Sequence, residues 1–431
     1  MDALSCQQAL ETILSHVHPP GSGELPLDRL HGRVLAGDIH ARSDDPPTPR
    51  SAMDGFALQS SDSRGASPAA PVRLEFSGVV GAGHAPAGEV APGGAVRVMT
   101  GALIPAGADA VVRQEDTEPL GEGAFALKGP LEPGENITPA GAHLKKGSLI
   151  GQRGEALTAR HLSLLAGQGL PAAPVFRVPR VGVLSLGDEL ALPGTSLSPG
   201  QIHASNLHLL AGLIAGTGAE PVLLGIGRDD PRAAEQKLRE AINGSAEQPP
   251  CRVIITTGGS HRGDFDFGED ILKGLGASVH FNRVRISVAT STIFGTLGGA
   301  GSVVLCFALP GPPTAVWLGF EILIRPALLM LCGRTATERF RTGAILGTPL
   351  QARPGCSHFI PARLENNPGD LPTVTPLHRR LELPRHYSLL ANALIVLDER
   401  GADLQPGARV NVELLEDCSP PGHREPVRSS T

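Results

Sequence analysis

An alternation of strand-like and helix-like segments between residues 179 and 332 constrains this chain more than any other feature of its sequence. The strand-like runs are short, apolar and rich in β-branched residues, and they read PRVGVLSL, PVLLGIG and CRVIITT. Strands that alternate with helices predict a parallel sheet with helices on both faces. Ligands of such sheets bind beyond the carboxyl ends of the strands. We therefore expect a binding site in the loops that follow these runs.

Local signals predict where the helices of this region begin and end. Ser205 is placed to cap a helix that ends at Gly218. Asp230 followed by Pro231 is a second start, because an aspartate N-cap satisfies free N–H groups and proline fits the first helical position. The segment GEDILKGLG predicts a third helix.

The rest of the chain predicts additional domains, because 431 residues exceed one ordinary domain. Short apolar runs between Gly/Pro turns indicate β structure on either side of the α/β region. The predicted fold class is thus α/β plus β, with a small barrel-like β domain inserted in an elongated linker domain in which residues 19–50 run along the surface. The expected parts are the linker domain at 1–50 and 141–178, the small β domain at 51–140, the doubly wound α/β domain at 179–332, a C-terminal β domain at 333–418 and a tail at 419–431.

Composition and charge exclude several classes of protein. A net charge of -6 without a basic block, and an aromatic content of 3%, argue against a nucleic-acid partner. The most apolar stretch, residues 315–332, contains Glu321 and Arg325. Each charge at a bilayer centre costs roughly 2.5–3.5 kcal/mol, so we expect a buried helix and no membrane partner.

The N-terminus and the cysteines predict a cytoplasmic protein. The first residues include Asp2 and Glu11 and lack the basic region of a secretory signal. The six cysteines are scattered and form no C-x-x-C pair. A disulfide framework or a zinc site is therefore not expected.

Acidic residues stand in loops and after three of the predicted strands. A single acid of this kind is usually a helix cap or a turn residue. Several acids at the same edge of a sheet would instead provide the oxygen ligands that Mg²⁺ prefers, and we favour that interpretation for the set. Its members are Asp54, Asp188, Glu189, Asp229, Asp230, Asp264 and Asp266.

Two glycine- and proline-rich turns are candidate anion sites. The first, GGSHRG, begins at Gly258 and Gly259 and ends at Gly263, so its N–H groups can face a phosphate beside Arg262. It lacks the GK[ST] of a P-loop, and His261 alone is more typical of a surface residue than of a base. The second turn, LPGPPTA, precedes a predicted helix and contains Pro310 and Pro313.

Six motifs occur in order along the chain: SAMDGFAL (51–58), VRVMTGALIPAGADAVV (96–112), VGVLSLGDEL (181–190), GIGRDDP (225–231), TTGG…GDFDF (256–267) and LPGPP (309–313). They resemble the motifs of the molybdopterin molybdenumtransferase family, which includes the C-terminal domain of gephyrin. The resemblance covers nearly the whole chain. It implies a homodimer of four-domain chains that inserts molybdate into adenylylated molybdopterin with Mg²⁺ and releases AMP. A molybdopterin adenylyltransferase is a further implied partner.

The resemblance also implies roles for individual residues, in a pocket between the α/β domain of one subunit and the β domains of the other. Glu189, Asp229 and Asp266 match the positions expected to hold the metal and molybdate. Asp54 and Thr100 match catalytic positions of the small β domain. Residues that match or replace cofactor-binding positions are Gly258, Gly259, His261, Arg262, Gly263, Arg283, Pro310 and Pro313.

Several positions depart from the family pattern. The family's K-P-G-K-P run is SVATS here, so Ser287 and Thr290 replace two lysines, whereas Arg283 keeps the charge of another. The other departures are Pro312 for an asparagine, Ala204 for an aspartate, His143 for an acid, and Tyr387 and Ser388 out of phase with a serine. His261 and Arg262 either supply the missing donors or fill the pocket.

Three further interpretations remain open beside the enzyme. A non-catalytic carrier that binds a pterin cofactor would explain the lost lysines. A scaffold acting through the dimer would need no substrate. A generic nucleotide-binding α/β enzyme is disfavoured by the motifs of the small β domain.

Overall fold

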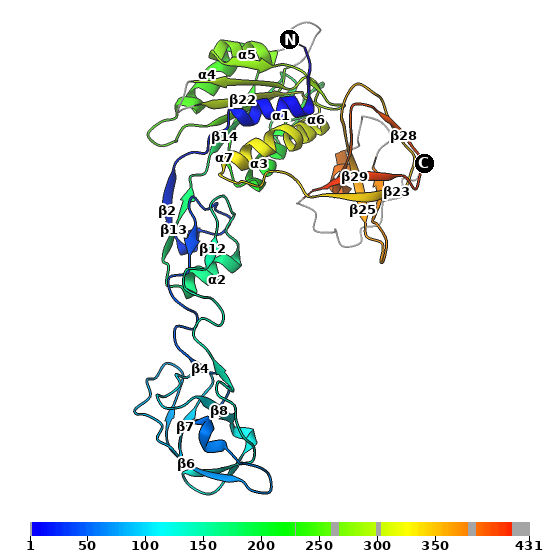
Figure 1. The fold of residues 1–431 in the computed structure, drawn as a ribbon. Coiled ribbons are helices and arrows are strands. Elements are labelled where there is room, and N and C mark those ends of the chain that lie inside the picture. The colour runs from blue at the N-terminus through cyan, green and yellow to red at the C-terminus, as the bar shows by residue number, and fades with distance from the viewer. Residues whose placement is uncertain (1, 229, 260–266, 299–302, 378–384, 416–431) are drawn as a thin grey trace.

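The computed structural model describes residues 2–228, 230–259, 267–298, 303–377 and 385–415, with only the backbone described at residues 267 and 385–387. The chain is elongated, with a small β domain at one end, a linker domain in the middle, and an α/β domain beside a β-barrel at the other end (Figure 1). This multidomain arrangement confirms the predicted fold class. Six predicted site residues lie outside the described residues: Asp229, His261, Arg262, Gly263, Asp264 and Asp266.

The α/β domain is built on a six-stranded sheet in the order β17-β14-β18-β22-β21-β19. The first four of these strands are parallel to one another, and β21 runs antiparallel to both of its neighbours. The three predicted strands are therefore present and adjacent. Their bounds are β14 Arg180–Leu186, β17 Glu220–Gly227, β18 Val253–Gly258, β19 Ser278–Phe281, β21 Ile293–Leu297 and β22 Val304–Leu309.

Helices cover both faces of this sheet, as the sequence predicts. Asp230 is the N-cap of α4 and its side chain accepts a hydrogen bond from the Arg232 N–H at 3.0 Å. The predicted Ser205 cap is wrong, because Ser205 is already the first residue of α3 and Ala204 at the N-cap has no side-chain acceptor. The helix bounds are α1 Cys6–Ser15, α3 Ser205–Gly216, α4 Pro231–Asn243, α5 Phe267–Leu275, α6 Pro313–Gly319, the π-helix η4 Phe320–Ile324 and α7 Arg325–Leu331.

The apolar stretch near residue 320 forms one continuous helix, Pro313–Leu331, and 78% of its most apolar window is buried within the protein. By length and composition it is the one helix among the described residues that could span a membrane. Glu321 lies inside the fold in contact with the Arg339 guanidinium, and its carboxylate is 3.9 Å from Arg325. Since all three side chains are at least nine-tenths buried, this ion cluster fixes the helix against the segment that enters the barrel.

The linker domain corrects the expectation that residues 19–50 follow the surface without regular structure. Three short strands in this segment pair with strands from residues 137–176, and leucines such as Leu30 and Leu35 are fully buried. The partners are distant in sequence, so the local turn-rich composition does not reveal them. The elements are β2 Ser22–Pro26, η1 Leu27–Arg29, β3 Ile39–His40, β4 Arg50–Ser51, β11 Ile137–Thr138, β12 Leu149–Gly151, α2 Ala159–Gly167 and β13 Ala172–Phe176.

The small β domain is a six-stranded mixed sheet in the order β8-β5-β7-β6-β10-β9. Its core contains Phe56 stacked on Phe125, with ring centroids 4.3 Å apart, and Phe76 beside them. The elements are β5 Gly55–Leu58, η2 Ser60–Ser63, β6 Val72–Val80, β7 Gly94–Val98, β8 Ala110–Arg113, η3 Gln114–Asp116, β9 Thr117–Pro119 and β10 Ala124–Leu127.

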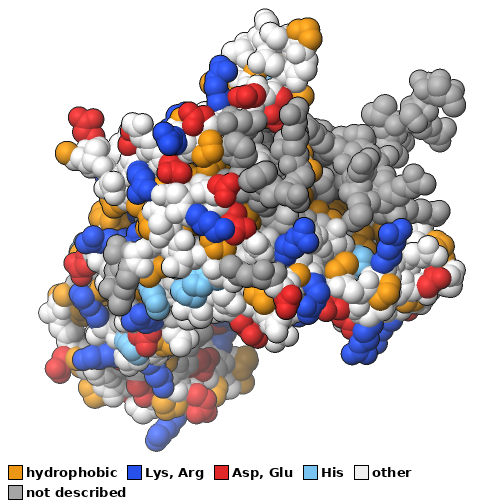
Figure 2. Space-filling model, turned by 90° about the horizontal axis from the view of Figure 1, so that it is seen from above, with side chains coloured by type: hydrophobic (Ala, Val, Ile, Leu, Met, Phe, Trp, Pro, Cys, Tyr) orange, Lys and Arg blue, Asp and Glu red, His pale blue; other side chains and the backbone are white. Residues whose placement is uncertain are grey.

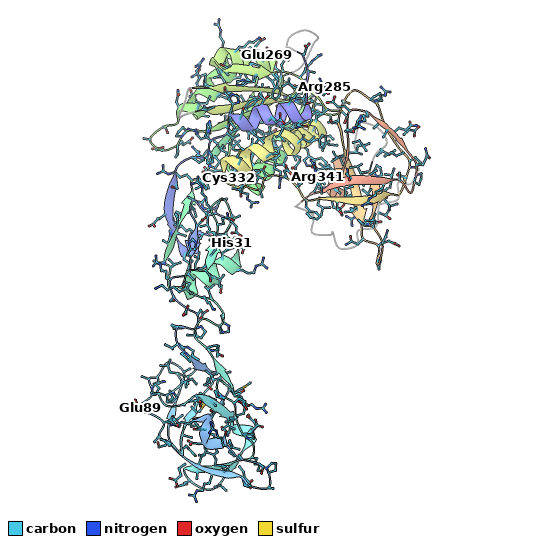
Figure 3. The ribbon with its side chains drawn as sticks, viewed as in Figure 1. His31, Glu89, Glu269, Arg285, Cys332 and Arg341 are labelled. Atoms are coloured by element: carbon cyan, nitrogen blue, oxygen red, sulfur yellow. The ribbon has the colours of Figure 1, made fainter. Side chains whose placement is uncertain are left out.

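The C-terminal β domain is a closed barrel in the order β23-β26-β25-β27-β29. Arg285 of the α/β domain contacts it by donating a hydrogen bond of 3.1 Å to Glu399 (Figure 3). The elements are β23 Arg341–Leu346, β24 Leu350–Ala352, β25 His358–Glu365, β26 Thr373–Pro376, η5 Arg385–Leu390, β27 Ala393–Leu397, β28 Ala402–Leu404 and β29 Arg409–Leu414. Two short parallel pairs lie outside these sheets: β1 Leu4–Ser5 with β20 Val284–Arg285, and β15 Leu190–Ala191 with β16 Ile202–His203.

Candidate functional site

The carboxyl ends of β17, β14, β18 and β22 lie side by side at one edge of the sheet. This edge is where an open parallel sheet binds its ligands. Glu189 follows β14, and the chain that contains Asp229 follows β17, its neighbour. The chain that leads to Asp266 leaves β18 on the other side of β14. The topology thus supports the predicted convergence of the loops, although the side chains of Asp229 and Asp266 lie outside the described residues.

Gly187 allows the Glu189 carboxylate to fold back over the end of β14. The backbone of Gly187 has φ +150°, and a Cβ atom placed there would be 2.4 Å from Glu189 Oε2. The Gly187 N–H donates to the Gly227 carbonyl at 3.1 Å, which ties the ends of β14 and β17 together. Glu189 is half-buried at this point. Its carboxylate therefore places a hard oxygen donor at the sheet edge.

The predicted turn at Gly258 and Gly259 requires glycine. Both residues have positive φ, and a Cβ on Gly258 would lie 2.3 Å from the Leu186 carbonyl oxygen. A Cβ on Gly311, in the turn after β22, would be only 3.6 Å from the Gly258 Cα. The ends of three adjacent strands therefore meet backbone to backbone and leave a floor without side chains. Pro310 and Pro313 flank Gly311, and Pro313 begins α6.

A cluster of polar side chains lies beneath this floor and was not predicted as functional. The Asn206 side-chain N–H groups donate to the Gly311 carbonyl at 2.8 Å and to Thr257 Oγ1 at 3.2 Å. Asn206 Oδ1 and Ser185 Oγ are buried and have no hydrogen-bond partner among the residues that the structure describes. Ser185 and Thr257 are paired residues of β14 and β18. The sequence signal was only the SN of HASN, next to the substituted Ala204.

The loop that replaces the lysine run reaches the same edge, because it precedes β21, which is antiparallel to β22. Its Thr290 hydroxyl donates to the Ile286 carbonyl at 2.8 Å, and Thr290 is exposed. Ala289, at the position of the motif's glycine, has φ +62°. A left-handed backbone is unfavourable for alanine. The loop thus has a backbone conformation that favours glycine, although the residue is alanine.

Arg283 is exposed in the turn between β19 and β20, at the same edge of the sheet but at its far end. It is the predicted substitute for a family lysine. The surface seen from above carries Lys/Arg and Asp/Glu side chains interspersed, without a large patch of one sign (Figure 2).

Asp54 and Thr100 form a pair in the small β domain. The Thr100 backbone N–H and its hydroxyl donate to Asp54 Oδ1 at 2.6 and 2.7 Å. These two hydrogen bonds, the backbone one first, lower the pKa of Asp54 below its ordinary value of 3.8. Both residues are exposed, so the carboxylate stays ionised and accessible across neutral pH.

Within one chain the structure does not bring all predicted site residues together. The small β domain and the α/β domain lie at opposite ends of the linker domain (Figure 1). The described part of the chain contains no group of three or more Asp, Glu, His or Cys side chains placed to hold a metal ion. Two of the three predicted metal ligands lie outside that part.

Two protein families match this chain, one in its N-terminal part and one in its α/β domain. Residues 4–169 match the family described as the MoeA N-terminal region (domain I and II), and residues 182–330 match a probable molybdopterin binding domain. A molybdopterin molybdenumtransferase from Bacillus subtilis (strain 168) is 34% identical over 395 residues, which cover 90% of this chain and 89% of the relative. This chain belongs to the molybdopterin molybdenumtransferase family. It is accordingly an enzyme of that kind.

Two further comparisons agree. The molybdopterin molybdenumtransferase 2 of Mycobacterium tuberculosis (strain ATCC 25618 / H37Rv) is 32% identical over 396 residues, covering 90% of this chain and 94% of the relative. The crystal structure of a molybdopterin biosynthesis MoeA protein from Pyrococcus horikosii superposes with a TM-score of 0.82 at 30% identity, covering 96% of this chain and 99% of that chain. The family resemblance seen in the sequence is therefore confirmed for the linker, β and α/β domains alike.

Proposed function

We propose that this enzyme inserts molybdate into adenylylated molybdopterin and releases AMP, with a site shared between two copies of the chain. The observation that carries the proposal is the side-chain-free edge at Gly258 and Gly311, with the Glu189 carboxylate beside it. This edge lies in the part of the chain that matches the probable molybdopterin binding domain. It combines two turns built on glycine with one nearby carboxylate.

The proposed metal is Mg²⁺, held by Glu189 together with Asp229 and Asp266. Carboxylate oxygens suit this ion, and the orientation of Glu189 over Gly187 fits such a role. When bound, Mg²⁺ offsets the negative charge of the two substrates and polarises a phosphoryl oxygen. Backbone N–H groups of the Gly258–Gly259 turn, Arg262 and Arg283 are proposed to hold the phosphates, and Pro310 and Pro313 to shape the adjoining wall.

The proposed homodimer follows from the separation of Asp54 from Glu189. Asp54 and Thr100 are exposed and belong to the small β domain, which the linker domain separates from the α/β domain (Figure 1). A second copy in the opposite orientation would bring its small β domain to the sheet edge. There the Asp54 carboxylate, held ionised by Thr100, would accept a proton or orient a nucleophile. We further propose a cytoplasmic location and a molybdopterin adenylyltransferase as the supplier of the substrate.

The proposed reaction is tested with purified protein, adenylylated molybdopterin, molybdate and Mg²⁺. We expect AMP to appear in amounts that depend on molybdate. If calorimetry shows that the adenylylated pterin binds but AMP does not exceed the level without protein, the proposal is wrong.

A second candidate function is a non-catalytic carrier of a pterin cofactor. The observation that favours it is the loop at residues 287–291, in which hydroxyl groups of Ser287 and Thr290 replace two ammonium groups. One charged hydrogen bond contributes roughly 1.5–3 kcal/mol, so their loss weakens an anion site. Tight pterin binding without AMP release under the same assay would support the carrier.

A further inference from the structure

The Asn206 side chain connects three elements that meet at the proposed site. Asn206 is the second residue of α3, Thr257 is next to last in β18, and Gly311 lies in the turn between β22 and α6. Its amide group donates to both Thr257 Oγ1 and the Gly311 carbonyl. One side chain therefore holds the start of a helix against the ends of two strands.

The orientation of this amide is settled by its partners. The Gly311 carbonyl can only accept, so the nitrogen of the amide must face it. The oxygen then points to the other side, where it is buried without a partner among the described residues. Buried acceptors without partners are rare in folded proteins, and they occur where another requirement outweighs stability.

The two backbone segments that Asn206 holds are those whose closeness forms the floor. A Cβ on Gly311 would be 3.6 Å from the Gly258 Cα, which is van der Waals contact, and a Cβ on Gly258 would clash with the Leu186 carbonyl oxygen at 2.3 Å. Small displacements of such segments misplace any ligand that rests on both. We call the Asn206 amide with its hydrogen bonds to Thr257 and Gly311 the Asn206 clamp. It lies where it sets the distance between the Gly258–Gly259 turn and the Gly311 turn.

We propose that Asn206 is a positioning residue of this enzyme, which sets the spacing of the two ligand-binding turns by donating to Gly311 and Thr257. The expected effect on AMP release rests on the proposed function. The expected effect on hydrogen exchange of the two turns does not. Asn206 acts through the turns and does not itself contact the reacting atoms.

The test is the Asn206→Asp variant, which keeps the size of the side chain. At high pH a carboxylate faces the Gly311 carbonyl, and two oxygens that cannot donate repel each other. At low pH the protonated carboxyl group regains one donor and can restore the contact with Gly311. We expect kcat/KM for AMP release at pH 8 to fall by roughly 10- to 100-fold, and the loss relative to wild type to shrink as the pH falls toward about 5.5.

Two further variants separate positioning from general stability. Asn206→Ala should lose activity to a similar degree, without recovery at low pH, and should still fold because Leu207, Leu210 and Ile214 anchor α3 in the core. His208→Ala changes an exposed residue of the same helix and should behave as wild type at every pH.

Hydrogen exchange of the free protein gives a readout that needs no substrate. We expect the amides of residues 256–259, 311 and 314–316 to exchange faster in Asn206→Asp than in wild type at pH 8. The ratio of the two exchange rates should approach one at low pH. If wild type releases no AMP, the proposed function is wrong. The exchange rates still test whether Asn206 sets the spacing of the two turns. If exchange and activity of Asn206→Asp follow wild type at all pH values, or if its defect does not depend on pH, the positioning role is overturned.

Discussion

The small β domain and the α/β domain present their candidate residues in opposite ways. Asp54 and Thr100 are a finished pair, exposed and hydrogen-bonded within one domain. The edge of the α/β sheet instead supplies glycine turns, the half-buried Glu189 and loops that depart from the family pattern. The proposed reaction needs residues of both regions. One elongated chain holds the two regions apart, so the proposal requires a second copy (Figure 1).

The largest effect is expected from the α/β side. Glu189→Gln removes the fixed charge while keeping the shape of the side chain, so AMP release should fall by roughly 100-fold or more. Glu220→Gln is the matched control, since Glu220 begins β17 at the opposite edge of the sheet. Steady-state assays of both variants check this. Equal activity of Glu189→Gln and wild type would remove Glu189 from the site.

Asp54→Asn should lower kcat by roughly 10- to 100-fold, because in the proposed dimer the exposed carboxylate would face the sheet edge of the second copy. Because the folded pKa of Asp54 is lowered, the group stays ionised as the pH falls to about 5, and no loss of activity in that range should come from it. Thermal unfolding should shift only slightly to lower temperature, because the asparagine Oδ1 can still accept both hydrogen bonds from Thr100 and only their charge-assisted part is lost. Asp116→Asn, an exposed acid of the same domain, is the control. A fall in unfolding temperature that accounts for the lost activity would contradict a role in the site.

The third prediction restores the missing lysines of the α/β domain instead of removing an acid. Ser287→Lys and Thr290→Lys each return one ammonium group to the loop beside the floor. Each should tighten binding of molybdate by about tenfold, which corresponds to one charge-assisted hydrogen bond. Calorimetric titration with molybdate measures this, and Ser278→Lys is a control for charge alone, because Ser278 is exposed at the start of β19 and at the opposite edge of the sheet. If neither loop variant binds more tightly than the control, the loop does not face the anion.

The smallest effect concerns the same loop. Ala289 has a left-handed backbone, so Ala289→Gly should stabilise the protein by up to about 1 kcal/mol, less the entropy that glycine gains in the unfolded chain. Denaturant unfolding measures the change. Destabilisation of more than this amount would show that the Ala289 methyl group, which is buried, contributes more by packing than it loses by strain.

Much of the α/β domain could be predicted because its signals are local. The strand runs and the Asp230 cap depend on neighbours in the sequence, and all are present in the structure. The β2 strand was missed because its partner β13 lies about 150 residues later, as the numbers of Leu25 and Ala173 show. The Ser205 cap was wrong by one position.

The site was predicted only in part for the same physical reason. Glycines with positive φ, such as Gly258, can be predicted because they lie in a motif rich in turn residues. The Asn206 clamp depends on Gly311, 105 residues later, and no local pattern indicates it. The distance between Asp54 and Glu189 depends on how the domains are arranged, which no local sequence pattern indicates.

The most direct test of the shared site mixes two inactive chains. The Asp54→Asn chain keeps Glu189, the Glu189→Gln chain keeps Asp54, and a mixed dimer has one site with both residues. Co-expression with two tags and isolation of doubly tagged dimers should recover AMP release at about half of the wild-type rate per dimer. If the doubly tagged dimers form but remain as inactive as either parent, the two residues do not act together across subunits, and the central claim is wrong.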